Sequence, residues 1–203
     1  MKIYKTLLIA LLLSSASLFA QKYPTINIGE KMPMQQTEIF DTEEKSTTLN
    51  KNLKNNGILI VFTSNSCPFV VMWEDRYQLL EEKCRNSNIG MVYINSNQAK
   101  RSGDDSVEKM KNHSREMGYT FPYLIDKNSE MANAFGAKTT PHIFLFNNEK
   151  ALVYKGAIDD NYKSANDVTE NYLLDALEQV SNQQNISIKE TKAVGCSIKR
   201  IRK

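Results

Sequence analysis

The sequence predicts an α/β fold with a mixed central sheet that helices cover on both faces. Five apolar, β-branched and aromatic runs have the character of buried strands: 58–63, 89–95, 121–126, 142–146 and 151–158. Segments with helical spacing separate the first four runs, and such alternation is typical of a sheet between helical layers. The turn sequence "NNEK" joins the last two runs, which predicts an antiparallel hairpin at one edge.

Apolar periodicity and capping signals predict four helices. They cover residues 68–86, 104–117, 129–135 and a final segment from Asn166 or Asp167 to about 180. The first helix has an apolar stripe made of Val70, Trp73, Tyr77, Leu80 and Cys84. We interpret Cys84 on this stripe as a core thiol. The charged residues of the same helix are predicted to form its solvated face: Glu74, Asp75, Arg76, Glu81, Glu82 and Lys83.

The first 20 residues have the pattern of a secretory signal peptide. Lys2 and Lys5 precede the apolar run 7–13, and small residues lead to Ala20. We expect cleavage near residue 17 or 20, export to a bacterial periplasm or the extracellular space, and no stable membrane insertion, because the apolar run is short for a bilayer. Removing residues 1–20 lowers the formal net charge from +3 to +1, which argues against nucleic acid as a partner.

The rest of the chain is predicted to form one domain, residues 21–188, followed by a basic tail, residues 189–203. The tail carries six lysines or arginines and one glutamate. It also contains Cys196, and its positive charge is expected to lower the pKa of that thiol. Three cysteines in an exported chain leave at least one thiol unpaired or redox-active.

Cys67 is the strongest candidate for a reactive residue. It precedes Pro68 at the junction of a predicted strand and helix. Backbone N–H groups at a helix N-terminus favour an anion, and proline suits the first helical position. This environment favours the nucleophilic thiolate of Cys67.

Four segments in order resemble a known group of proteins. "IGEKMP" (28–33), "NSCPFV" (65–70), "TTPHIFLF" (139–146) and "AVGCSIKR" (193–200) are similar to segments of thioredoxin-fold redoxins. The resemblance is to the peroxiredoxin-like branch of the alkyl hydroperoxide reductase and thiol-specific antioxidant superfamily. It implies a thioredoxin-like fold with an N-terminal redoxin-type extension, and a thiol-dependent oxidoreductase that needs no cofactor and no metal.

The resemblance also implies site residues and partners. Cys67 would attack a disulfide or a peroxide, and Cys196 would resolve the intermediate. Pro68, Thr140 and Pro141 would contact the substrate, with a cis Thr140–Pro141 bond and a free backbone edge for an extended chain. The partners would be a thiol or disulfide protein, or peroxide, together with an external thiol reductant. His142 begins a buried strand, and we interpret it as structural rather than as a metal ligand.

Several positions depart from the families that the chain resembles. Val70 stands where thioredoxins carry their second cysteine, and Val61 where they carry a buried acid. Ile60 replaces the proline of the peroxiredoxin motif, Ser64 keeps its hydroxyl, and no arginine matches the one that polarises the peroxide. Two alternatives to a disulfide oxidoreductase therefore stay open. One is a thiol peroxidase, and the other is a thioredoxin-fold binding module without turnover.

Overall fold

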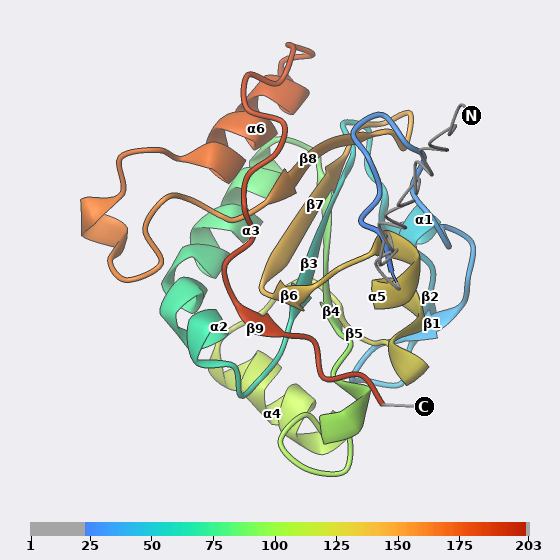
Figure 1. The fold of residues 1–203 in the computed structure, drawn as a ribbon. Helices are drawn as coiled ribbons and strands as arrows, with labels where there is room; N and C mark the ends of the chain where they lie inside the picture. The colour runs from blue at the N-terminus through green and yellow to red at the C-terminus, as the bar shows by residue number, and fades with distance from the viewer. Residues whose placement is uncertain (1–22, 202–203) are drawn as a thin grey trace, which may run out of the picture.

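The computed structural model describes residues 23–201, and the predicted signal peptide lies outside them. Its centre is a five-stranded sheet (Figure 1) in the order β5-β4-β3-β7-β8. The strands are β3 (Ile58–Thr63), β4 (Gly90–Asn95), β5 (Tyr123–Ile125), β7 (His142–Phe146) and β8 (Leu152–Gly156). β4 runs parallel to β3 and β5, whereas β7 runs antiparallel to β3 and β8. The predicted mixed sheet with a hairpin at one edge is confirmed.

The predicted helices are present, with changed boundaries. Residues 68–86 form α2 (Pro68–Trp73), a 3-10 turn η1 (Glu74–Arg76) and α3 (Tyr77–Asn86). The others are α4 (Val107–Glu116), α5 (Glu130–Phe135) and α6 (Tyr172–Ser181). α4 starts later than predicted because the Ser106 hydroxyl caps it by accepting from the Lys109 N–H at 3.3 Å. Asn166 and Asp167 do not cap the last helix but lie in a separate 3-10 turn, η4 (Ala165–Asp167).

Alternate residues of β3 face two separate cores. Leu59 and Val61 pack with side chains from α3, α4 and α6. Ile58, Ile60 and Phe62 pack with α5 and with α1 (Leu49–Asn52). Every residue of β3 is buried, which is why residues 58–62 are all apolar instead of alternating with polar ones. Helices therefore cover both faces, as the sequence predicted.

The prediction that the charged residues of 68–86 are solvated is wrong for Glu74, Arg76 and Glu81. Glu74 is 5% exposed, and its Oε1 lies 2.5 Å from His113 Nε2 and accepts from the Tyr119 hydroxyl. Glu81 is 2% exposed and accepts from the Tyr93 hydroxyl at 3.1 Å. Charged groups are buried where other elements satisfy them, and periodicity along one helix does not reveal such partners.

The N-terminal extension lies against the edge strands. Residues 26–32 follow β8, where the Gly29 N–H donates to Leu152 O and the Met32 N–H to Lys150 O, each at 2.8 Å. A small hairpin follows, made of β1 (Ile39–Phe40) and β2 (Ser46–Thr47). It meets the opposite edge, where the Thr42 N–H donates to Tyr123 O at 3.0 Å.

The C-terminal tail crosses the domain instead of leaving it. After α6 it passes β8, where the Thr191 N–H donates to Lys155 O at 3.0 Å. It then forms β9 (Cys196–Ser197), which pairs antiparallel with β6 (Thr139–Thr140). Figure 1 shows this red segment running across the molecule from α6 to the lower end of the sheet. Ile198 is 6% exposed and joins the second core. No helix within residues 23–201 is long and apolar enough to cross a membrane.

Candidate active site

Cys67 lies between the end of β3 and the start of α2. It is the N-cap residue of α2, and Pro68 occupies the first helical position, as predicted. The Cys67 N–H donates to Ser64 Oγ at 3.2 Å, which fixes the turn between strand and helix. The side chain is only 5% exposed, and its S–H donates to the carbonyl oxygen of Thr140 at 3.1 Å. The thiol therefore faces the segment that precedes β7.

The Thr140–Pro141 peptide bond is cis, which confirms the prediction. The predicted free edge at Thr140, however, is not free in this structure. Thr140 is paired with Cys196, and Thr139 with Ser197, in the β6–β9 ladder. The chain's own tail thus occupies the backbone edge that the sequence analysis assigned to an extended substrate.

Cys196 lies opposite Thr140 and beside the Cys67 thiol. Both cysteines are free thiols in the structure. Burial and the neighbouring Cys67 raise the pKa of the Cys196 thiol, although the Phe69 N–H and Lys199 act in the opposite direction. The expected lowering of this pKa by the basic tail is therefore wrong, because burial and Cys67 outweigh the positive charge of Lys199.

Gly195 lets the tail approach this closely. A Cβ atom at this position would lie 2.2 Å from Thr140 O and 3.1 Å from Pro141 N. Any side chain at residue 195 would therefore push the tail away from the cis-proline segment. Glycine at this position is what allows Cys196 to pair with Thr140.

A buried carboxylate connects the Cys67 loop to the tail. Asp105 is fully buried and accepts from the Asn65 N–H at 2.9 Å and from Asn97 Nδ2 at 2.9 Å. This leaves Asn97 Oδ1 to accept from the Lys199 N–H at 2.8 Å, while Lys199 O accepts from the Ala99 N–H at 2.8 Å. The tail is thus held at Lys199, three residues after Cys196.

A small pocket opens beside the two cysteines. Its volume is about 220 Å³. Its lining residues are Ser64, Ser66, Cys67, Pro68, Asn97, Lys100, Asp104, Cys196 and Lys199. The charged side chains of the lining are two lysines and one aspartate.

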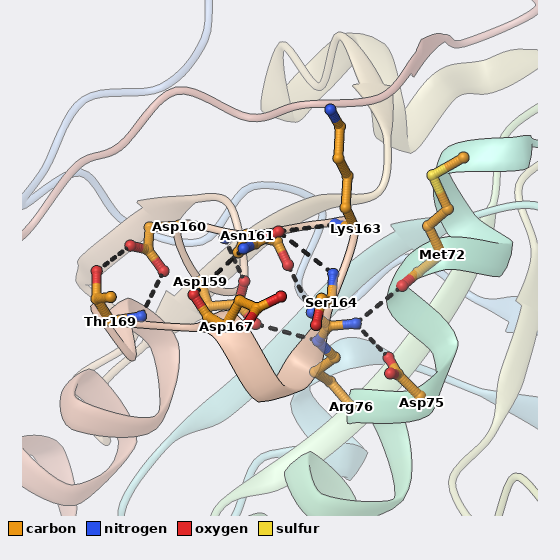
Figure 2. Close-up of polar contacts among 10 residues, drawn as sticks. All are labelled: Met72, Asp75, Arg76, Asp159, Asp160, Asn161, Lys163, Ser164, Asp167 and Thr169. Atoms are coloured by element: carbon orange, nitrogen blue, oxygen red, sulfur yellow. Dashed lines mark hydrogen bonds and ion pairs between the residues drawn. The ribbon is translucent and has the colours of Figure 1, made fainter.

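The buried Arg76, in the 3-10 turn η1 after α2, binds the loop that follows β8. Arg76 Nε donates to Asp159 Oδ2 at 3.2 Å, and Arg76 Nη1 donates to Met72 O at 3.0 Å (Figure 2). Arg76 Nη2 donates to Asn161 O at 2.5 Å. Arg76 and Asp159 are 7% and 5% exposed, and burial raises the pKa of Asp159. Tyr162 follows Asn161 in this loop, and its ring lies 5.1 Å from the ring of Phe69, two residues after Cys67.

Two further candidates are placed in the cores. Cys84 is fully buried, and burial raises the pKa of its thiol, so the interpretation as a core residue is confirmed. His142 is 5% exposed, and burial lowers its pKa to about 3. Its Nδ1 accepts from the Lys138 N–H at 3.2 Å, a structural contact. Among the described residues, no group of three or more His, Cys, Asp and Glu could hold a metal ion.

The sequence analysis missed the residues that hold the tail and the loop. Lys199 lies 102 residues after Asn97 in the chain, and nothing in the local sequence indicates that Asn97, Asp105 and Lys199 meet. The glycine directly before Cys196 was a usable signal, because it marks a close backbone approach. Nothing in the sequence around Arg76 and Asp159, apart from their opposite charges, indicates that they form an ion pair.

Of the positions compared with the peroxiredoxin motif, Ser64 lies beside Cys67 and Ile60 does not. The Ser64 hydroxyl contacts the Cys67 backbone, but Ile60 is fully buried in the second core. None of the arginines in residues 23–201 lines the pocket beside Cys67. The missing proline and arginine of the peroxiredoxin motif have no replacement among the pocket residues.

Comparisons with known proteins agree with this fold. The model of the AhpC/TSA family matches residues 28–155. A hypothetical protein from Sinorhizobium meliloti 1021 is 29% identical, with a TM-score of 0.81 over 89% of this chain and 98% of that one. An uncharacterized conserved protein from Geobacillus kaustophilus is 28% identical, with a TM-score of 0.82 over 89% and 96%. The peroxidoxin BcpB from Mycobacterium tuberculosis shares the fold at 15% identity, with a TM-score of 0.59 over 75% and 97%. No curated protein matches the chain.

Proposed function

The chain belongs to the AhpC/TSA family, and from this premise we propose that it is an exported thiol-disulfide oxidoreductase that uses Cys67 as nucleophile and Cys196 as resolving thiol. One observation carries the proposal. The β6–β9 pairing puts Cys196 opposite Thr140, whose carbonyl oxygen accepts from the Cys67 S–H at 3.1 Å. Val70 leaves the helix without a local resolving cysteine, so the tail supplies the second thiol.

The proposed reaction has two exchange steps. The Cys67 thiolate attacks one sulfur of a substrate disulfide, which releases one substrate thiolate and leaves a mixed disulfide. The Cys196 thiolate then attacks the Cys67 sulfur, releases the second substrate thiolate and forms a Cys67–Cys196 disulfide. The substrate gains two electrons and two protons, which the two cysteines lose.

The environment of Cys196 suits this order. The negative charge of an ionised Cys67 is among the causes that raise the pKa of Cys196. Once Cys67 is bound in a mixed disulfide, that charge is gone and Cys196 ionises more easily. Cys67 would therefore react first and Cys196 second.

The Cys196→Ser variant tests the division of roles. We expect its first reaction with a model disulfide to keep the wild-type rate, while the mixed disulfide at Cys67 accumulates and turnover stops. Mass spectrometry of acid-quenched samples identifies the adduct, and Cys84→Ser serves as the matched control with normal turnover. If the first step were slower in Cys196→Ser than in the wild type, Cys196 would have more than a resolving role.

A thiol peroxidase is the second candidate, and the contact between Ser64 and Cys67 favours it. Peroxide turnover is nevertheless expected to be slow, because the missing arginine and proline would otherwise position the peroxide oxygens. Stopped-flow oxidation by hydrogen peroxide decides between the two enzymes. A second-order constant of about 10⁷ M⁻¹s⁻¹ or more, near the diffusional range, would favour the peroxidase.

A binding module without turnover is the third candidate. It would use the Thr140–Pro141 segment, with Pro68 beside it, to hold a partner. Full biological effect of a Cys67→Ser variant would favour this function over both enzymes.

Export is part of the proposal and is supported by the pattern of residues 1–20. It implies a periplasmic or extracellular oxidoreductase, where disulfide exchange is needed. Cell fractionation and N-terminal sequencing of the recovered protein test it, and we expect a mature N-terminus near residue 18 or 21.

A further inference from the structure

We propose that the pocket beside Cys67 and Cys196 binds a small thiol that carries a carboxylate, and that this thiol reduces the Cys67–Cys196 disulfide. The inference rests on the proposed function, since it identifies the class of external reductant. It is carried by three observations: a closed backbone edge, a small pocket, and two lysines in the lining of that pocket.

The closed edge disfavours a polypeptide reductant. A protein partner that binds as an extended strand needs free N–H and C=O groups along the edge of Thr140. In the structure Cys196 and Ser197 pair with that edge. Lys199 and Ile198 hold the tail there, through Asn97 Oδ1 at 2.8 Å and Lys138 O at 3.0 Å. While the tail is seated, Cys67 and Cys196 still line the pocket, through which a small molecule reaches them.

The size of the pocket indicates a small ligand. Its volume of about 220 Å³ is below the ~300–1,000 Å³ of sites that take drug-sized molecules. A molecule of the size of one amino acid fits such a space. Three polar residues form part of the lining: Ser64, Ser66 and Asn97.

The charges of the pocket favour an anion. Lys100 and Lys199 both line it, and Lys199 Nζ donates to Ser197 Oγ at 3.2 Å. Asp104 is the single acidic residue of the lining, and its Oδ2 lies 4.0 Å from Lys100 Nζ. Its other oxygen lies 3.4 Å from the ammonium group of Lys109, outside the pocket. With Asp104 paired in this way, the remaining charge is positive and attracts a carboxylate.

The exchange would begin at Cys196. Cys67 is 5% exposed, whereas Cys196 is half-buried and more accessible from the pocket. A small thiolate attacks the Cys196 sulfur, the disulfide breaks, and Cys67 leaves as a thiolate. A second small thiolate attacks its bound counterpart, which gives a small-molecule disulfide and the Cys196 thiolate. The two small thiols lose two electrons, and the two cysteines gain them.

The test measures reduction of the preformed Cys67–Cys196 disulfide in the full-length protein. The probes are thioglycolate, mercaptoethanol and cysteamine, which carry a carboxylate, a hydroxyl and an ammonium group. Rates are compared after correction for thiolate fraction and nucleophilicity. We expect thioglycolate to react about threefold or more faster than mercaptoethanol and cysteamine to react slowest, with smaller differences at high salt.

Two variants test whether the preference for a negatively charged thiol comes from the lysines of the pocket. The double variant Lys100→Gln with Lys199→Gln should react with the three probes at similar corrected rates, whereas Lys83→Gln, on α3, should keep the wild-type order. Equal rates in the wild type, or an unchanged order in the double variant, would overturn this inference. If the disulfide forms and only the charge preference is absent, the proposed function stands. If the disulfide never forms, the proposed function fails together with the inference.

Discussion

At the scale of single residues, three cysteines of one chain have three different environments. Cys84 lies in the first core, where burial raises the pKa of its thiol. Cys196 is half-buried, and burial and Cys67 raise its pKa. Cys67 is little exposed but lines the pocket and contacts Thr140. Residue type alone does not distinguish these thiols, whereas burial and neighbours do.

Differential alkylation tests this distinction. We expect iodoacetamide to label Cys67 faster than Cys84 in the reduced native protein, and Cys84 only on unfolding, because Cys67 lines the pocket whereas Cys84 is fully buried. Peptide mass spectrometry after short labelling times reports each site. Faster labelling of Cys84 than of Cys67 would contradict the assignment of the nucleophile.

His142 gives a pH prediction with a definite sign. Burial lowers its pKa to about 3 from an ordinary value of 6.5, with Lys138 and Lys155 contributing in the same direction. Between these values the unfolded chain binds a proton that the folded chain does not. Stability is therefore lost as pH falls below about 6.5, by up to about 1.4 kcal/mol per pH unit from this residue.

Urea unfolding from pH 7 to pH 4 measures this contribution. The His142→Gln variant should lose less stability over the range than the wild type, because glutamine does not titrate. Parallel curves for the two proteins would show that His142 contributes nothing to acid sensitivity.

At the scale of elements, the tail is held by close contacts rather than by apolar burial alone. The Gly195→Ala variant should displace it, because the added Cβ would lie 2.2 Å from Thr140 O. We expect resolution of the Cys67 mixed disulfide to slow by at least tenfold while the first reaction continues. Ser197→Ala, an exposed neighbour, is the control and should resolve normally. If Gly195→Ala resolved the Cys67 mixed disulfide at the wild-type rate, resolution would not require the tail to pair with Thr140.

The Arg76–Asp159 pair is the second element-scale contact. Arg76→Gln leaves Asp159 buried without its ionic partner, so we expect a loss of about 3–5 kcal/mol in the free energy of unfolding, less what protonation of Asp159 recovers. Lys83→Gln removes a more exposed pair with Glu178, 3.1 Å long, and should cost about 1 kcal/mol or less. Equal losses in the two variants, measured by urea unfolding, would contradict a structural role for Arg76.

At the scale of the whole molecule, the sequence predicts the sheet better than the contacts made over long distances. The five strands follow from apolar runs because both of their faces are buried. The hairpin of β1 and β2 escapes prediction because each strand has two residues. The pairing of β9 with β6 joins residues 139–140 to 196–197, and only the folded chain brings them together.

In the candidate site too, local motifs are predicted from the sequence, whereas contacts between distant segments are not. Cys67, Pro68 and the cis Thr140–Pro141 bond are located correctly from short motifs. The seated tail and the buried Glu74, Arg76 and Glu81 depend on partners from other elements, so local patterns give the wrong environment for them. Three-dimensional contacts, not local composition, set the pKa of Cys196.

The central claim is that Cys67 and Cys196 form one redox pair. Peptide mapping of the full-length oxidised protein tests it most directly, with the reduced protein and Cys84→Ser as controls. We predict one disulfide, Cys67–Cys196, in the wild type and in Cys84→Ser, which requires the two Cα atoms to lie within about 7 Å. A Cys67–Cys84 disulfide, or an unmodified Cys196 thiol after complete oxidation of Cys67, would contradict the account.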